Sequence, residues 1–254
     1  MDHHAKKANY VLRSQQEWDR KLAFLELFQS NAGIPDEEIL DNLGVFMSRQ
    51  LLSRVLFMHH IYQKIIPVHG SILEFGTRYG QNLALFSNFR GIYEPFNHNR
   101  KIIGFDTFAG FEEIDKHDGQ HPSIYKGAYN VSSNYEATLE KILAYHESES
   151  PLSHIKKYEI VKGDASQTVP QYLRDNPYTT IALAYFDMDV YKPTKDCIEA
   201  IRPHLVKGSV VGFDEANHPV FPGETIAIME TFGLNNIKLQ RVPFNPTTSY
   251  FVVE

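Results

Sequence analysis

Apolar residues follow two different spacings along this chain, and the change falls near residue 70. Over residues 10–66 they recur every three or four positions, which predicts amphipathic helices and no strand. From residue 71 onward, short continuous apolar runs alternate with stretches of helical spacing. Continuous runs are typical of parallel strands that are covered on both faces. They predict five strands at residues 72–75, 102–105, 158–161, 181–186 and 210–213, and two closing strands at 237–242 and 249–253.

Local signals also predict where several helices begin. Ser14 and Glu17 form a capping box ahead of the first helix, and Pro35 is a favourable first-turn residue for the next one. Ser133 and Glu136 form a second capping box. Further helices are expected over residues 47–66, 166–173 and 194–205.

The alternation of strands and helices predicts the fold class and the division of the chain. We expect an α/β fold with a doubly wound, mostly parallel sheet over residues 67–254. Residues 1–66, which contain no strand signal, are expected to form an N-terminal helical cap or lid. Residues 107–132 are rich in glycine, histidine and aspartate, and are expected to be a mobile loop.

Composition narrows the range of partners. The formal net charge of −6 and the pI near 6.1 argue against a nucleic-acid partner and against an anionic membrane surface. The single cysteine, Cys197, excludes an internal disulfide and a cysteine-rich metal site. No apolar run approaches the ~18–20 residues of a membrane span, and the N-terminus lacks the apolar core of a signal peptide. These features predict a cytoplasmic protein.

The first predicted strand ends in a turn that suits a positively charged ligand. Gly76 and Gly80 permit positive φ angles and a close approach to the backbone. The carboxylate of Glu74 would repel a pyrophosphate, and the turn lacks the G-x-G-x-x-G pattern of dinucleotide-binding proteins. S-adenosylmethionine carries a positive charge together with hydroxyl and amine donors, so it is the cofactor that we expect here.

Each of the five predicted buried strands terminates in an acidic residue or is followed by one. These acids are Glu74, Asp106, Asp164, Asp187 and Asp214. The carboxyl ends of parallel strands meet at one edge of a sheet, where ligands of open α/β folds bind. Asp106 is placed to accept hydrogen bonds from both ribose hydroxyls, and Asp164 lies where the adenine amine would come. The alternative for any one of these acids is a loop aspartate that caps the next helix.

The full set of expected cofactor-binding residues extends these acids along their motifs. Arg78 could pair with the methionyl carboxylate of the cofactor, or could be an ordinary surface guanidinium. The set is Glu74, Gly76, Thr77, Arg78, Tyr79, Gly80, Asn82, Asp106, Thr107, Phe108, Gly163, Asp164, Ala165 and Asp187.

A second group of acids follows the fourth and fifth predicted strands. Asp187 and Asp189 are expected to converge with Asp214 and Glu215, and like charges this close need protonation or a divalent cation. Oxygen ligands without cysteine favour Mg²⁺, so Asp187, Asp214 and Glu215 are candidate metal ligands. Such an ion would lower the pKa of a substrate hydroxyl. The alternative is a solvated acidic rim. Asp189 and His218 are candidate catalytic bases, although a lone loop histidine is more often simply exposed.

Five motifs together carry a resemblance to a known family. They are LEFGTRYG at residues 73–80, GFDTFAG at 104–110, GDASQT at 163–168, FDMDVYKPT at 186–194 and GFDE at 212–215. These motifs resemble class I S-adenosylmethionine-dependent methyltransferases, and more closely the macrocin O-methyltransferase family of sugar O-methyltransferases. The resemblance covers about residues 65–235.

The resemblance implies a seven-stranded doubly wound sheet, S-adenosylmethionine as methyl donor and a Mg²⁺ site for a hydroxyl acceptor, here a sugar or a glycosylated small molecule. Asp187 and Asp214 match the family's metal-binding acids, and Asp189 matches the second acid of its Asp-x-Asp-x-Tyr pattern. Glu215 stands where the family usually has an aspartate. Family members are oligomers whose helical N-terminal segments help to close the site, so we expect a homo-oligomer.

Two rival functions remain open from the residues. The first is an NAD-dependent or nucleotide-sugar-dependent enzyme on a similar sheet, which Glu74 in the turn argues against. The second is a non-catalytic S-adenosylmethionine-binding accessory protein, which the acids at Asp187, Asp189 and Asp214 argue against.

Overall fold

The computed structural model describes residues 14–254 of the chain. The chain divides into two compact units, Met1–Arg54 and Val55–Glu254. Residues 1–13, which include the start of the expected segment 1–66, lie outside the described residues. Within residues 14–254, no helix combines the length and the apolar character that crossing a membrane requires.

The described part of the first unit is helical, as expected. It contains α1 (Gln15–Gln29), three short 3₁₀ turns, η2 (Asn31–Gly33), η3 (Asp36–Glu38) and η4 (Leu43–Phe46), and the first residues of α2 (Arg49–Ile65). The predicted capping box is confirmed, because the Ser14 side chain accepts from the Glu17 amide and the Glu17 side chain accepts from the Ser14 amide. The helix predicted after Pro35 is only the single turn η3. Over residues 14–54 no side chain is buried.

The second unit is built on one sheet of six strands. The strands are β1 (Ser71–Phe75), β2 (Ile102–Asp106), β3 (Tyr158–Lys162), β4 (Ile181–Phe186), β5 (Leu205–Phe213) and β6 (Ser249–Val252). Their order is β3-β2-β1-β4-β5-β6, and only β6 runs antiparallel to its neighbour. The strand order therefore reverses between β1 and β4, which is where open α/β sheets bind their ligands.

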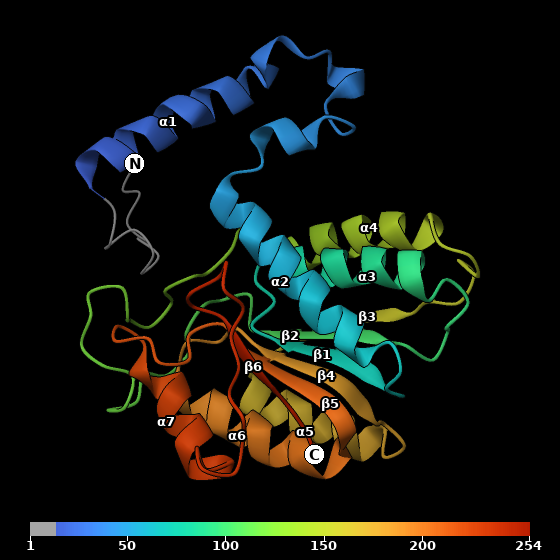
Figure 1. Cartoon of the computed structure of the whole chain (residues 1–254), viewed down its shortest axis with the longest axis vertical. Helices are drawn as coiled ribbons and strands as arrows, with labels where there is room; N and C mark the ends of the chain where they lie inside the picture. The colour runs from blue at the N-terminus through green and yellow to red at the C-terminus, as the bar shows by residue number, and fades with distance from the viewer. Residues whose placement is uncertain (1–13) are drawn as a thin grey trace. The chain divides into compact units, whose positions relative to one another are not determined.

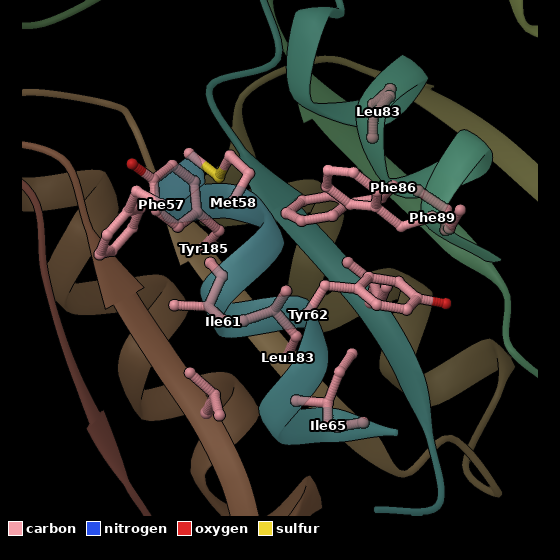
Figure 2. Close-up of a cluster of buried hydrophobic side chains, with 14 of the residues drawn as sticks. Phe57, Met58, Ile61, Tyr62, Ile65, Leu83, Phe86, Phe89, Leu183 and Tyr185 are labelled. Atoms are coloured by element: carbon pink, nitrogen blue, oxygen red, sulfur yellow. The ribbon is translucent and has the colours of Figure 1, made fainter. Parts of the chain in front are cut away.

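Helices cover both faces of this sheet (Figure 1). One face carries α2, α3 (Gln81–Tyr93) and α4 (Tyr135–Ser148), and the other carries α5 (Ala165–Asp175), α6 (Tyr191–Ile201) and α7 (Pro222–Thr231). The apolar residues of α2 recur at helical spacing, so that Phe57, Ile61 and Ile65 point toward the sheet (Figure 2). A second cluster of buried side chains fills the α5–α7 side. The doubly wound α/β prediction is confirmed.

Two details of the prediction are wrong. The sheet has six strands where seven were expected, because residues 237–242 make only an isolated bridge between Gln240 and Tyr250. Apolar alternation in that stretch does not lead to a strand, because pairing at the edge of the sheet depends on what the neighbouring strand presents. The second capping box is also absent, since Asn134 caps α4 in a left-handed conformation without a side-chain hydrogen bond. The Glu136 carboxylate pairs with Lys162 on β3 instead.

Candidate functional site

The expected acids lie in one row along the carboxyl edge of the sheet. Hydrogen bonds continue the parallel ladder one residue past the strand ends, from the Asp187 amide to the Phe75 carbonyl (2.8 Å) and from the Asp214 amide to the Phe186 carbonyl (3.0 Å). The Gly163 amide likewise donates to the Asp106 carbonyl (2.9 Å). Together with the bond from the Gly76 amide to the Phe105 carbonyl (2.9 Å), these bonds align the ends of β3, β2, β1, β4 and β5, where the acids lie.

Neighbouring segments leave no room for a side chain at either glycine of the turn after β1. Gly76 has a φ of 90°, and a Cβ atom there would collide with the carbonyl oxygen of Asp187 and lie 2.6 Å from its carbonyl carbon. Gly80 has a φ of 77° and is the N-cap of α3, and the side chain of Leu139 fills the space that a Cβ atom at Gly80 would need. A side chain at Gly76 would thus push apart the ends of β1 and β4, between which the ligand crevice lies.

The carboxyl group of Glu74 lies beneath this turn. Glu74 is 1% exposed, and its Oε1 accepts a hydrogen bond from Asn82 Nδ2 at 2.7 Å. Thr77 Oγ1 and Asn82 Oδ1 lie close by in the sequence and are buried without a hydrogen-bond partner in the described part of the chain. Buried oxygens without partners are costly unless a ligand supplies donors. A ligand with an ammonium or hydroxyl donor, such as S-adenosylmethionine, fits these residues.

Asp106 is held rigidly at the end of β2. Its two carboxylate oxygens accept from the amides of Arg78 (2.6 Å) and Phe108 (2.5 Å). Burial raises the pKa of Asp106, although these amides and the Arg78 charge oppose the rise. The next residue, Thr107, donates its hydroxyl to the Gly110 carbonyl, which shapes the start of the following loop.

Arg78 has a setting that the sequence did not show. Its guanidinium carbon lies over the rings of both Tyr79 and Tyr129, at 4.8 and 5.1 Å from their centroids. Its Nε is buried and has no hydrogen-bond partner within residues 14–254. The aromatic contacts leave the N–H groups at the edge of the guanidinium group to bind an anionic group. Tyr129 comes from the long loop after β2, so only the folded structure could reveal it.

Asp164 caps the helix that follows it, which is the alternative to cofactor binding that the sequence left open. It is the N-cap of α5, and its Oδ1 accepts from the Ser166 amide at 2.9 Å. Gly163 precedes it with a φ of 141°, and Ala165 is the first residue of the helix. These three residues remain at the carboxyl edge, next to Asp106 through the strand-end hydrogen bond described above.

Five carboxyl groups form what we call the acid group: Asp187, Asp189, Asp214, Glu215 and Glu224. All but Asp187 are buried. Asp214 accepts from the Tyr185 hydroxyl (2.7 Å), and Glu224 accepts from the Glu215 amide (2.9 Å). Burial, reinforced by the surrounding carboxylates, raises the pKa of Glu215 to about 10, and burial raises the pKa of Glu224 well above its ordinary value.

Glu224 was not among the predicted site residues. It lies in the first turn of α7, where an acidic residue is a common stabilising feature, so sequence alone gave no reason to single it out. The chemistry of the acid group fits a hard cation, because every donor is a carboxylate oxygen. Within residues 14–254, however, no three carboxylate, histidine or cysteine side chains already stand in the arrangement of a metal-ligand group.

His218 lies against the acid group but has its accepting nitrogen occupied. Its Nδ1 is 3.7 Å from Glu215 Oε2 and accepts from the Val220 amide at 3.3 Å. Burial lowers the pKa of His218, so the ring is neutral near neutral pH. With Nδ1 as an acceptor, the proton of the neutral ring sits on Nε2, and no second basic nitrogen remains.

Asp189 occupies a strained position between β4 and α6. Its φ is 63°, in the left-handed region that residues other than glycine seldom adopt, and its side chain is 8% exposed. Left-handed residues of this kind persist only where surrounding contacts hold them. The structure therefore places a buried carboxyl group at the carboxyl edge of β4 through backbone geometry that must be maintained by its neighbours.

Comparison with known proteins identifies close structural relatives. No model of a known family and no curated protein matches the chain. The crystal structure of CalS11, a calicheamicin methyltransferase, matches with a TM-score of 0.91 and 41% identity over 94% of this chain and 93% of that one. An apo structure of CalS11, described as a TDP-rhamnose 3'-O-methyltransferase, matches with a TM-score of 0.84 and 38% identity over 99% of both chains. The O-methyltransferase NovP shares the fold, with a TM-score of 0.59 and 17% identity over 79% of each chain.

Proposed function

This chain belongs to the sugar O-methyltransferase family of the class I S-adenosylmethionine-dependent methyltransferases, and from that membership we propose that its acceptor is a sugar carried on a nucleoside diphosphate. The supporting observation is the match to CalS11, whose described acceptor is TDP-rhamnose, at 38% identity over 99% of both chains. The family membership also leaves the NAD-dependent alternative without support.

The residues around β1 and β2 would hold the methyl donor. S-adenosylmethionine supplies an electrophilic methyl group on a sulfonium sulfur. The Glu74 carboxylate, with the unpartnered oxygens of Thr77 and Asn82, suits the ammonium group of the methionyl moiety. Asp106, locked by two backbone amides, suits the ribose hydroxyls, and the edge of the Arg78 guanidinium suits the methionyl carboxylate.

We assign the proton-accepting role to Asp189 rather than to His218. Asp189 is buried at the end of β4, whereas the accepting nitrogen of His218 already has a partner in the Val220 amide. Positioning the acceptor hydroxyl beside the donor methyl group contributes most of the rate enhancement in such transfers. Asp189 would take the hydroxyl proton as the new carbon–oxygen bond forms and the methyl–sulfur bond of the donor breaks, which leaves the neutral thioether S-adenosylhomocysteine.

The proposed function also includes a bound divalent cation. Asp187, Asp214 and Glu215 would hold Mg²⁺, which would lower the pKa of the acceptor hydroxyl. The support is electrostatic, because burial and the neighbouring carboxylates disfavour an ionised Glu215 unless a positive charge is supplied.

The proposed function is tested by calorimetry and by methyl transfer. We expect S-adenosylmethionine to bind, and methyl transfer to TDP-rhamnose to exceed transfer to free rhamnose by at least tenfold. Asp187→Asn should retain cofactor binding and lose Mg²⁺-dependent turnover, while Asp175→Asn on the exposed end of α5 serves as the matched control. Equal transfer to the free and the nucleotide-linked sugar would refute the acceptor class. Full turnover in Asp187→Asn, or in the presence of a chelator, would refute the metal.

We also propose that the protein is a homo-oligomer that associates through its first unit. A 15-residue helix is only marginally stable without packing, yet none of the side chains of α1 is buried. Its exposed apolar side chains are Leu22, Phe24, Leu25, Leu27 and Phe28. Exposed apolar patches of this kind are typical of association surfaces. The expectation that residues 1–66 act as a cap stays a prediction.

Light scattering tests the association. The wild-type protein should have at least twice the monomer mass, and the double variant Leu22→Glu, Leu25→Glu should shift toward the monomer. Gln29→Glu, an exposed polar position on the same helix, is the control. A monomeric wild-type protein would refute the association.

A further inference from the structure

The long loop after β2 contains no helix or strand, and among its attachments one fixes its base and another its middle. Residues 107–132 form this loop, which is the green trace beside α7 in Figure 1. At the first attachment, the loop closes on itself, because the Phe111 amide donates to the Ala128 carbonyl (3.1 Å) and the Gly127 amide donates to the Phe111 carbonyl (2.8 Å). The second attachment lies at its middle and joins the loop to a helix 73 residues farther along the chain.

Asp118 makes this second attachment. Its side chain is 1% exposed, its Oδ1 accepts from the Tyr191 amide (2.5 Å) and its Oδ2 accepts from the Asp115 amide (2.6 Å). Tyr191 is the first residue of α6, and the first amides of a helix have no partner within the helix. Val190, the N-cap residue, has no side chain that can accept, so Asp118 supplies the missing cap from outside the helix.

Two further contacts show that this junction is tightly packed. A Cβ atom at Gly223, in the first turn of α7, would collide with Asp118 Oδ1 and lie 2.7 Å from the Tyr191 amide nitrogen. The ring of His117 packs on the ring of Tyr191, with 4.4 Å between their centroids. Asp118 therefore lies where the loop meets the first turns of both α6 and α7.

The acid group occupies the same two segments. Asp189 precedes Tyr191 by two residues, and Glu224 follows Gly223 directly. Asp189 holds a left-handed φ of 63°, and the backbone after it is fixed by the Val190 amide, which donates to the Met188 carbonyl (2.7 Å), and by Tyr191 bound to Asp118. A backbone in a strained conformation needs neighbours that hold it there.

We propose that Asp118 is a positioning residue for methyl transfer, which caps α6 from the loop and thereby holds Asp189 and the middle of the loop, residues 115–118, in place on the acceptor side of the site. This role rests on the proposed function in that it assigns the proton-accepting group to Asp189. It leaves the cofactor residues of β1 and β2 untouched, because Asp118 contacts neither strand end through any of these bonds.

The role predicts a specific split in kinetic constants. Asp118→Ala should lower kcat for the nucleotide-linked sugar by about 10- to 100-fold, since a displacement of about 1 Å can cost that much. The affinity for S-adenosylmethionine, measured by calorimetry, should change less than twofold, and the binding stoichiometry should report the folded fraction. Asp118→Asn, which keeps one accepting oxygen for the Tyr191 amide, should recover part of the loss. Lys116→Ala, an exposed neighbour in the loop, is the control.

A double-mutant cycle tests the attachment itself. Gly223→Ala inserts a methyl group against Asp118 Oδ1 from the other side, so it should reproduce the kinetic defect of Asp118→Ala. If both act by breaking one attachment, the double variant should be no worse than the poorer single variant. Multiplicative losses, an unchanged kcat in Asp118→Ala, or a loss that follows the folded fraction alone would each overturn the proposal.

Hydrogen exchange separates this proposal from the proposed function. In Asp118→Ala the amides of residues 188–191 should exchange faster than in the wild type, while those of β1 and β4 should not change. Unchanged exchange at residues 188–191 overturns the positioning role whatever the acceptor is. A wild-type protein that transfers no methyl group to the nucleotide-linked sugar refutes the proposed function instead.

Discussion

Replacing Gly76 by alanine forces a methyl group into the backbone of the neighbouring strand end. Gly76 has a φ of 90°, and an alanine in a left-handed conformation costs about 1–2 kcal/mol by itself. The new Cβ would also lie 2.6 Å from the carbonyl carbon of Asp187, whereas ordinary contacts begin at 3.4 Å. The turn after β1 and the end of β4 must therefore separate by on the order of 1 Å, a shift that can cost about 100-fold in rate.

The separation would act on both halves of the site, because the cofactor turn and Asp187 lie on either side of the contact. We expect Gly76→Ala to weaken binding of S-adenosylmethionine, measured by calorimetry, and to lower kcat/KM by about 100-fold. The melting temperature should fall by about 2–4 °C for each kcal/mol lost, as expected for a unit of this size.

Gly127→Ala separates the collision from the backbone penalty. Gly127 has a similar φ of 82°, but a Cβ atom there would have nothing within 4 Å. This control should lose the stability that a positive φ costs an alanine and should keep its affinity for S-adenosylmethionine. If the two variants bind S-adenosylmethionine equally well, the contact with Asp187 does not govern the site and the reasoning from strand-end packing is refuted.

Three further predictions concern charges and burial. Arg78→Met should weaken the binding of S-adenosylmethionine by about 10- to 100-fold, which is the value of a charged hydrogen bond. The affinity for methylthioadenosine, which lacks the carboxylate, should not change in the same titration. Equal losses of affinity for both ligands would contradict the carboxylate contact. Glu94→Gln should lower the unfolding free energy by about 3–5 kcal/mol near neutral pH, because it leaves Arg100 buried without its anion. Burial alone would raise the pKa of Glu94, but hydrogen bonds from Arg100 and Tyr62 outweigh it and lower that pKa. The stabilisation is therefore present above the unfolded-state pKa and is lost as pH falls through the folded-state pKa. Urea unfolding should show that the difference in unfolding free energy between wild type and variant shrinks in acid, and a constant difference would count against the ion pair. Burial raises the pKa of the Cys197 thiol, so a thiol reagent should react with it only at the rate of unfolding, and fast labelling of the native protein would show that the α6 face opens.

The fold class and most strand positions could be predicted from the sequence. Strands buried on both faces need continuous apolar runs, and such runs mark β1 to β5 in the sequence. Weak edge pairing was harder to predict. Residues 237–242 have a strand-like composition, but they make only one bridge, because pairing at an edge depends on what the neighbouring strand presents.

In the candidate site, too, some features could be predicted from the sequence and others depend on the folded structure. The sequence places an acid within two residues of the end of each of five strands, and parallel pairing then aligns their carboxyl ends, so the row of acids was predictable. Whether one acid caps a helix, as Asp164 does, or lies in a buried group, as Asp214 does, depends on its spatial neighbours.

By itself, then, the sequence determined the α/β class and the carboxyl edge on which the acids gather, since both follow from residue order within single strands and turns. Only the tertiary structure decided that Tyr129 stacks on Arg78, that Glu224 joins the acid group and that Asp118 caps a helix 73 residues away. These contacts join segments that lie far apart in the chain, and they form because burying a polar group requires a partner, which the folded packing supplies wherever one comes within reach.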